Sequence, residues 1–164
     1  MATKETVFKK DEANKKIFVT RNFDAPIDAV WKAWTTAELL DKWWAPKPYR
    51  AETKTMDFRE GGMWLYCMVG PEGDRHWGRV DYLAIEKHLS ISAMPGFCDE
   101  DGNMNPEAPR SNWLKKFSES EGTTTVNIEI TYNKIEDMKR ILEMGFEGGF
   151  KMGLGNLDDL LAAS

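Results

Sequence analysis

The sequence predicts an α+β domain in which a curved antiparallel sheet of about six to seven strands wraps round a long C-terminal helix. Three observations indicate this class. Several short segments alternate between apolar and polar side chains, as half-buried strands do. Two short helical segments follow the first of these strands. After residue 135 the apolar spacing becomes that of a helix, so strands and helices are segregated along the chain.

The length and charge of the chain favour one globular domain without a polyanionic partner. A chain of 164 residues fits a single domain, which we expect over 15–164 after a flexible N-terminal segment over 1–14. The net charge of −5 offers no basic face to nucleic acid. The polar start lacks the apolar stretch of a secretory signal, and no apolar run reaches the roughly 20 residues that span a bilayer. We therefore expect no membrane insertion and a cytoplasmic location.

The first strand and two short helices are predicted from the N-terminal part of the chain. Residues 16–24 alternate in polarity, which suits a strand. Pro26 is favoured at the first position of a helix, where its missing N–H costs nothing. Thr35 and Glu38 have the spacing of a capping box, which predicts a second helix. Pro46 should end that helix.

Strands should occupy most of the middle of the chain. We expect four of them after the second helix, over 49–58, 63–69, 76–87 and 89–97. Residues 98–110 are polar with glycine and two prolines, which predicts a long loop. Segments 113–119 and 123–132 should then form a hairpin across Ser120-Glu121-Gly122, and the second arm should have one buried face.

A long helix is predicted over 135–163. Its apolar stripe contains Leu142, Phe146, Phe150, Leu157 and Leu161. The segment also holds five glycines, and each costs roughly 0.5–1 kcal/mol relative to alanine inside a helix. Packing against the sheet must therefore hold this helix, and its glycines would let the backbones approach closely.

No catalytic or cofactor-binding constellation stands out from the sequence. The two histidines, His76 and His88, lack metal-ligand spacing. No nucleotide-binding or nucleophile motif follows a predicted strand. Cys67 and Cys98 lack zinc-type spacing and are expected to be reduced thiols. We therefore expect no catalytic residue, no cofactor and no metal.

The unusual feature of the composition is its content of aromatic and methionine side chains. The chain has 7 Trp, 8 Phe and 9 Met; the rings supply rigid apolar area, and Met adapts to irregular shapes. These side chains could simply fill a core, but a curved sheet around a helix tends to leave an internal space for a ligand. The residues expected to line that space are Trp31, Trp34, Trp43, Trp44, Phe58, Trp64, Tyr66, Met68, Tyr82, Met94, Phe97, Trp113, Ile128, Leu142, Phe146 and Phe150.

Polar anchors for a ligand in such a space are scarce. Arg21 and His76 are the main candidates, and the hydroxyl groups of Tyr66 and Tyr82 are two more. For Arg21, a structural ion pair is the favoured alternative.

Part of the chain resembles a known family. The string RNFDAPIDAVWKAWTTAELLDKWWAPKPY is similar to the opening of the family named for the activator of the Hsp90 ATPase, within the START-like superfamily related to polyketide cyclases and Bet v 1. The residues that fit the family's pattern are Arg21, Phe23, Ala25, Pro26, Val30, Trp31, Trp34, Thr35, Glu38, Leu39, Trp43, Trp44 and Pro46. Weaker similarities at Asp57–Gly62, Gly78–Val80 and the final helix extend the resemblance over about residues 15–163.

The resemblance implies the helix-grip fold and a cavity between the sheet and the long helix. It implies no defined reaction, because the family shares no catalytic residues that could be carried over. The eukaryotic activators have a separate chaperone-binding domain, for which this chain has no room, so the resemblance does not imply co-chaperone activity. The loop at 98–110 is longer than usual for the family and could cover the cavity mouth.

Three functions are compatible with these observations. The first is binding of a small hydrophobic molecule, lipid-like or aromatic, in the internal cavity. The second is an enzyme of the cyclase, hydratase or hydrolase type that uses the same cavity, with His76 as the first candidate group. The third is a stress-response or chaperone-associated interaction module, which predicts an exposed apolar patch. A homodimer through an open sheet edge is left open.

Overall fold

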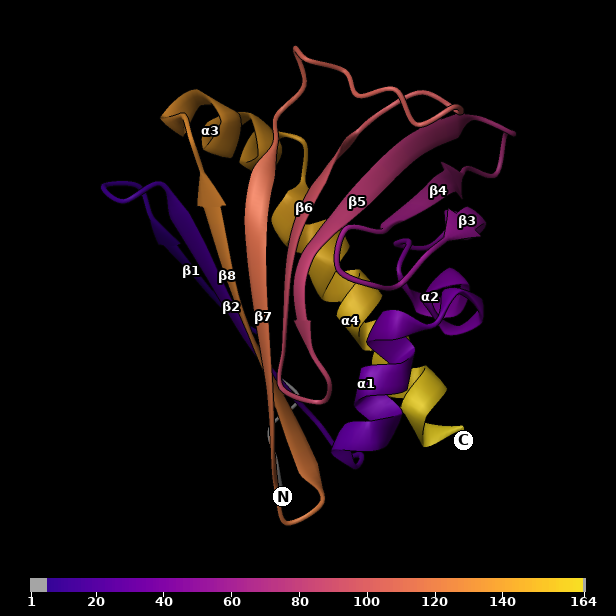
Figure 1. The fold of residues 1–164 in the computed structure, drawn as a ribbon, viewed down its shortest axis with the longest axis vertical. Helices are drawn as coiled ribbons and strands as arrows, with labels where there is room; N and C mark the ends of the chain where they lie inside the picture. The colour runs from indigo at the N-terminus through magenta and orange to yellow at the C-terminus, as the bar shows by residue number, and fades with distance from the viewer. Residues whose placement is uncertain (1–5, 164) are drawn as a thin grey trace.

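Eight strands form one antiparallel sheet in the computed structural model, which describes residues 6–163 (Figure 1). The strands are β1 (Val7–Asp11), β2 (Lys16–Phe23), β3 (Arg50–Met56), β4 (Met63–Val69), β5 (Arg75–Glu86), β6 (Ser90–Phe97), β7 (Ser111–Ser120) and β8 (Thr123–Tyr132). Their order across the sheet is β1-β2-β8-β7-β6-β5-β4-β3. The predicted α+β class with a curved antiparallel sheet is confirmed, with more strands than expected.

The additional strand, β1, lies in the segment that was expected to be flexible. Val7–Asp11 pairs along its whole length with β2. The ring of Phe8 lies 6.0 Å from that of Phe146 in the C-terminal helix, which gives the strand an apolar contact on the core side. The prediction of a flexible segment over 1–14 is therefore wrong for β1. Residues 1–5 of that predicted segment lie outside the described range.

Two short helices, α1 (Ile27–Thr35) and α2 (Ala37–Trp43), follow β2 as predicted. Pro26 occupies the N-cap position of α1 instead of its first helical position, so the helix begins one residue later than expected. The capping box does not form. The hydroxyl of Thr35 instead donates to the carbonyl oxygen of Trp31 at 2.8 Å, and the residue that caps α2 makes no side-chain bond.

The C-terminal helical segment is broken into α3 (Ile135–Glu143) and α4 (Phe146–Ala162). Gly145 between them has a φ of +88°, a left-handed conformation that glycine adopts without a steric penalty. The prediction of one helix over 135–163 missed this break because the apolar spacing continues across it. In Figure 1, α3 lies beyond the end of β8, which leaves α4 as the helix that the sheet grips.

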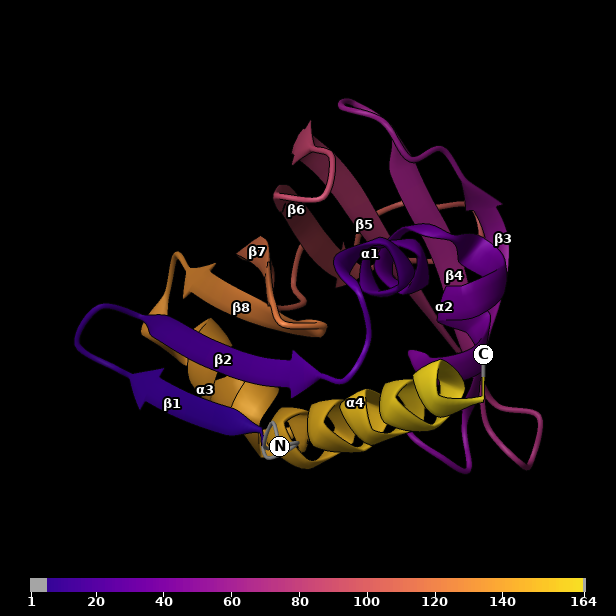
Figure 2. The same ribbon diagram turned by 90° about the horizontal axis from the view of Figure 1, so that it is seen from below.

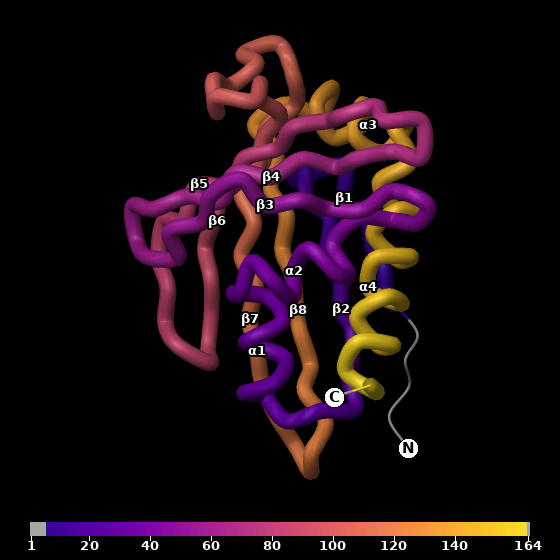
Figure 3. The backbone as a smooth tube through the Cα atoms, turned by 90° about the vertical axis from the view of Figure 1, so that its right-hand side faces the viewer, coloured from indigo at the N-terminus to yellow at the C-terminus, as the bar shows by residue number. Residues whose placement is uncertain are grey.

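Helix α4 lies across the concave side of the sheet (Figure 2). The sheet curves from β1 and β2 round to β4 and β3, and α4 spans the open side between these edges. Figure 3 shows α1 and α2 on the same side of the sheet as α4, with α2 next to β3 and α1 near β7 and β8. The side of α4 that faces this assembly buries Phe150, Leu154 and Leu157. The arrangement is that of a helix-grip fold.

Gly153 is the point at which α4 comes close to the end of α2. A Cβ at this position would lie 3.2 Å from the carbonyl oxygen of Trp44. One turn later, the Nδ2 of Asn156 donates to the carbonyl oxygen of Ala45 at 3.1 Å. The expected close approach of backbones therefore occurs here, whereas Gly155 faces open space.

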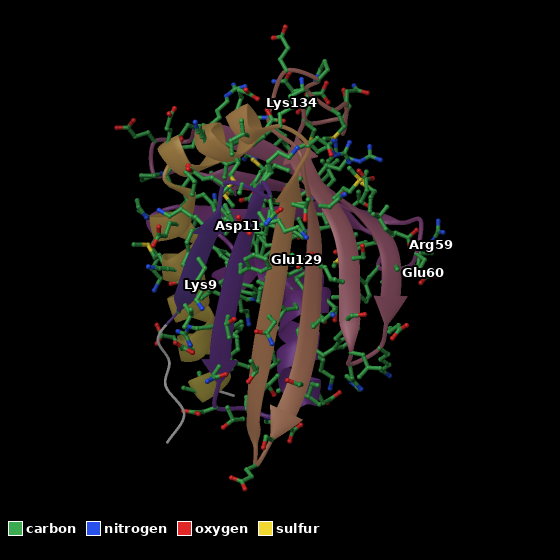
Figure 4. The ribbon with its side chains drawn as sticks, turned by 90° about the vertical axis from the view of Figure 1, so that its left-hand side faces the viewer. Lys9, Asp11, Arg59, Glu60, Glu129 and Lys134 are labelled. Atoms are coloured by element: carbon green, nitrogen blue, oxygen red, sulfur yellow. The ribbon has the colours of Figure 1, made fainter. Side chains whose placement is uncertain are left out.

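The two faces of the sheet differ in polarity. On β8, Val126, Ile128 and Ile130 are buried, as the alternation predicts. On the outer face, the Thr20 hydroxyl donates to Asn127 at 2.9 Å across β2 and β8. Figure 4 shows this outer face with its polar side chains in view. The apolar side chains of the sheet therefore gather on the concave face, towards α4.

Candidate functional site

A cavity of about 310 Å³ lies between the concave face of the sheet and the helices α3 and α4. This volume falls within the range of about 300–1,000 Å³ that small-molecule sites occupy. Its walls come from β4 to β8 on one side and from both C-terminal helices on the other. The wall residues are Trp44, Pro46, Tyr66, Met68, His76, Trp77, Gly78, Pro95, Gly96, Phe97, Pro109, Ser111, Trp113, Tyr132, Ile141, Met144, Gly145, Phe146, Gly149 and Phe150.

Strand β4 presents its aromatic set to the cavity. The sequence left the orientation of this strand undecided, because both alternating sets of side chains are apolar. Tyr66 and Met68 lie on the cavity wall. The opposite set includes Leu65 and Cys67, which are also buried. The outer side of β4 must therefore be covered by another segment.

The long loop between β6 and β7 provides that cover in its first half. Arg79 on β5 donates to the carbonyl oxygen of Gly102 at 3.0 Å. The second half of the loop reaches the cavity region, where Arg140 of α3 donates to the carbonyl oxygen of Glu107 at 2.8 Å. The expectation of a loop over the cavity mouth therefore applies to the second half alone.

Aromatic rings from the sheet and from α4 pack against each other in the wall of the cavity. The rings of Trp113 and Phe150 lie edge to face with their centroids 5.4 Å apart, and Phe146 stacks on Phe150 at 5.3 Å. The ring of Tyr66 lies over Gly78, where a Cβ would be 2.7 Å from the Tyr66 Cζ. A glycine is therefore needed at this point of β5 if the Tyr66 ring is to lie flat against the wall.

His76 and Asp74 form a polar pair at the mouth of the cavity. The side chain of His76 is 62% exposed, and its Nε2 lies 2.9 Å from the Asp74 Oδ2. The same oxygen accepts a bond from the Tyr49 hydroxyl at 2.8 Å. The bonds from Tyr49 and His76 hold the pKa of the Asp74 carboxyl below its usual value. The pair therefore brings a negative charge to the solvent side of the site.

Arg21 does not reach the cavity. Its side chain is 5% exposed and forms an ion pair with Asp158 of α4. Its Nη1 also donates to the carbonyl oxygen of Asn22 at 2.8 Å. The proposed role as a ligand anchor is therefore replaced by the structural alternative, in which the guanidinium ties β2 to α4.

A second, smaller space of about 20 Å³ adjoins the cavity and shares Trp44, Pro95 and Trp113 with its wall. Its remaining lining residues are Trp34, Leu40, Trp64, Val80, Tyr82, Ala93 and Lys115. The lysine is 7% exposed, and burial lowers its pKa from 10.5 to about 8. Burial likewise raises the pKa of the Tyr82 hydroxyl. This small space is therefore polar at a few points and otherwise apolar.

The residues predicted from the sequence divide into three groups. On the cavity wall lie Trp44, Tyr66, Met68, His76, Phe97, Trp113, Phe146 and Phe150. Around the smaller space lie Trp34, Trp64 and Tyr82, together with Trp44 and Trp113. Within the described range 6–163, neither space is lined by Trp31, Trp43, Phe58, Met94, Ile128, Leu142 or Arg21.

The residues outside both spaces include two tryptophans that fill the core near α1 and α2. The Nε1 of Trp43 donates to the carbonyl oxygen of Ala33 at 2.9 Å. The ring of Trp31 lies 5.1 Å from that of Phe117. These contacts follow from the position of the two short helices at one end of the sheet, whereas the cavity lies at the α3–α4 junction.

Lys115 is the functional candidate that sequence reasoning missed. It lies on β7 between Trp113 and Phe117, and all three side chains are buried on the same face of the strand. The signal was present in the sequence, because a lysine in the middle of an apolar alternating face is rarely buried without a partner.

The described residues contain neither a metal-binding cluster nor a membrane-spanning helix. Within residues 6–163, no three His, Cys, Asp or Glu side chains are grouped so that they could hold a metal ion. Over the same range, no helix combines the length and the apolarity needed to cross a bilayer. Cys67 and Cys98 are both free thiols.

An antiparallel sheet that grips a C-terminal helix and encloses an aromatic cavity defines a helix-grip protein of the START-like class. The family described as Activator of Hsp90 ATPase homolog 1-like protein matches this chain over residues 24–162. The chain therefore belongs to that family, as the resemblance implied.

Solved bacterial structures share the fold. Protein Ms6760 from Mycobacterium smegmatis is 30% identical with a TM-score of 0.89, and the match covers 98% of this chain and 99% of that chain. A protein from Arthrobacter aurescens is 28% identical with a TM-score of 0.90, covering 96% and 92%. A protein from Staphylococcus epidermidis is 26% identical with a TM-score of 0.83, covering 95% and 93%. No curated protein matches the chain.

Proposed function

We propose that the protein binds a small hydrophobic molecule, lipid-like or aromatic, in the cavity between the sheet and helices α3 and α4. The observation that carries this proposal is a space of about 310 Å³ whose wall is mostly aromatic and aliphatic. Protein interiors are close-packed and hold few voids larger than a water molecule. A space of this size that opens to solvent leaves apolar wall residues against water, and an apolar ligand would remove that surface from water.

Apolar filling is the favourable way to occupy such a space. The rings of Trp113, Phe146 and Phe150 contact one another, and each contributes part of its surface to the cavity wall. A hydrophobic body placed against them would regain dispersion contacts and remove apolar surface from water. The aromatic wall is therefore suited to a flat ring system or an alkyl chain.

Exposed wall residues mark an entrance. His76 and Met144 lie on the cavity wall and have exposed fractions of 62% and 58%. They come from β5 and from the break between α3 and α4. A ligand could therefore enter at the α3–α4 junction, beside Gly145, without disturbing the core that α1 and α2 build.

Binding is better supported than catalysis. The His76–Asp74 pair lies at the solvent boundary, whereas acid–base groups are usually tuned by exclusion from water. We therefore place binding in the cavity ahead of an enzyme of the cyclase, hydratase or hydrolase type. The family description names an Hsp90 ATPase activator, and a chaperone-associated role has no feature of the cavity in its favour.

The proposal can be tested with N-phenyl-1-naphthylamine, an uncharged dye whose fluorescence rises in apolar surroundings. Titration of the full chain should give saturable fluorescence with one site, and unlabelled decan-1-ol should displace the dye. Gly149→Leu should abolish binding, because Gly149 lies on the cavity wall and its nearest neighbour, the Pro46 Cγ, would be an ordinary 3.7 Å from a Cβ. The longer side chain would then occupy the ligand's space.

A matched control lies next to that position on the same helix. Gly148 is exposed and a Cβ there would meet nothing within 4 Å, so Gly148→Leu should leave dye binding unchanged. Absence of saturable dye fluorescence, or equal binding by both leucine variants, would show that this cavity is not a ligand site.

A further inference from the structure

The most unusual side chain of the core is Lys115. On β7 it lies between Trp113 and Phe117, and its partners on the neighbouring strands are Ile91 and Ile128, both buried. Among residues 6–163 no charged group offsets the effect of burial on this amine, since desolvation is the sole influence on its pKa. A buried ammonium without a counter-ion is a costly feature that a methionine or leucine would avoid.

Within residues 6–163, the groups found to favour the charge of Lys115 are two indole rings. The Lys115 Nζ lies 5.3 Å from the ring centroid of Trp34 and 6.0 Å from that of Trp113. These cation–π contacts hold the amine in place beside the small space without supplying a hydrogen-bond acceptor. The three protons of the ammonium are therefore available to an acceptor that enters this space.

Two of the tryptophans that line the same small space have unusual indole nitrogens. The indole N–H groups of Trp34 and Trp44 are buried and have no hydrogen-bond partner among the described residues. By contrast, the Nε1 of Trp64 is satisfied by the Thr53 hydroxyl at 3.0 Å. Buried polar groups are normally paired, and each exception calls for an explanation. The Tyr66 hydroxyl lies near the Trp44 indole, and its oxygen can accept a hydrogen bond from the Trp44 N–H.

The small space has one charged group in its lining, the Lys115 ammonium. The Tyr82 hydroxyl and the indole nitrogens of the tryptophans are the other polar groups of the residues that line it. An ionised carboxylate is an acceptor at both oxygens, with about four lone-pair positions. It would match the charge of Lys115 and accept hydrogen bonds from its ammonium.

Size restricts the group that can fit. The space measures about 20 Å³, and about 10–15 Å³ is needed for one water molecule. A carboxylate head or a water or two can enter, whereas a bulky head group cannot. Trp44, Pro95 and Trp113 border both spaces, so the small space and the larger cavity lie against the same three side chains.

We propose that the small space is the head-group site of the cavity, and that the ligand is a monocarboxylic acid with an apolar body whose carboxylate pairs with the Lys115 ammonium. This assignment rests on the proposed binding function and adds the chemical class of the ligand. Lys115 acts in it as a specificity determinant, because it distinguishes an acid from a neutral molecule of the same shape.

The experiment compares decanoate with decan-1-ol, which share an alkyl chain and differ in the head group. Displacement of N-phenyl-1-naphthylamine at pH 7 gives both affinities in the wild-type chain, in Lys115→Met and in Lys116→Met. The control residue is the exposed neighbour of Lys115 and points to the other face of β7. Methionine keeps the length of the lysine side chain and removes its charge.

We expect the wild-type protein to bind decanoate about tenfold or more tightly than decan-1-ol, the scale of one charge-assisted hydrogen bond. Lys115→Met should remove this preference and still bind the dye and the alcohol, and Lys116→Met should behave as the wild type does. A ratio of the two affinities that changes by less than about twofold in Lys115→Met would overturn the assignment of the head-group site. Failure of the dye to bind the wild-type chain would instead overturn the binding function itself.

Discussion

Replacing Lys115 by methionine should make the unliganded protein more stable at neutral pH. Burial lowers the pKa of this amine from 10.5 to about 8, which corresponds to about 3 kcal/mol of destabilisation when the group is charged. The contacts with the Trp34 and Trp113 rings offset about 0.5–2 kcal/mol of this cost. The expected gain for Lys115→Met is therefore about 1–3 kcal/mol in the free energy of unfolding at pH 7.

The gain should shrink as the pH rises. The amine has a lower pKa in the folded chain than in the unfolded chain, so between pH 8 and pH 10.5 the unfolded chain binds more protons. Wild-type stability therefore increases with pH through this window, and the variant lacks that increase. Between pH 7 and pH 9.5 the difference should fall by about 1–2 kcal/mol. Burial raises the pKa of the Tyr66 and Tyr82 hydroxyls from their ordinary value.

Urea unfolding followed by tryptophan fluorescence, at pH 7 and pH 9.5, measures both effects. Lys116→Met is the control, because it removes an exposed charge from the adjacent position. A Lys115→Met variant that is less stable than the wild type at pH 7 would contradict this prediction. A stability difference between the two proteins that is the same at both pH values would also contradict it.

Two further predictions concern helix α4. In a thermal unfolding assay, Gly153→Ala should destabilise the protein by about 1–2 kcal/mol, because the new Cβ would lie too close to the end of α2. Gly155→Ala should stabilise the protein by about 0.5–1 kcal/mol in the same assay. Equal effects of the two variants would contradict the close approach of α4 to α2 at Gly153. Asp158→Asn should cost about 2–4 kcal/mol by leaving the buried Arg21 without its charge partner. The exposed neighbour variant Asp159→Asn should change the urea midpoint little, and a similar loss in both would argue against a specific ion pair.

Local periodicity was enough to predict most of the sheet. The strands expected over 63–69 and 123–132 coincide with β4 and β8. Their ends are set by residues with local effects, such as Gly122, whose φ of +80° suits the hairpin turn. Strand β1 was missed because its polar side chains give little signal, and it is held by pairing with β2 and by Phe8.

The membership of the cavity wall was less predictable. Trp43 and Trp44 are adjacent in sequence and equally aromatic, yet Trp43 bonds to Ala33 in the core and Trp44 borders both spaces. Composition and resemblance pointed to a cavity among such residues. The assignment of each ring depended on where α2 ends relative to α4, which no local pattern records.

The sequence by itself determined the fold class, the faces of most strands and the abundance of rings near the C-terminal helix, because alternation and helical spacing are properties of neighbouring residues. Tertiary structure alone decided what the charged residues of the concave face do. Arg21 pairs with Asp158, which is 137 positions away in the chain. Lys115 instead contacts two indole rings beside a small, mostly apolar space. Burial and charge pairing depend on contacts between distant segments, so the same residue type can become a structural tie or a candidate ligand site.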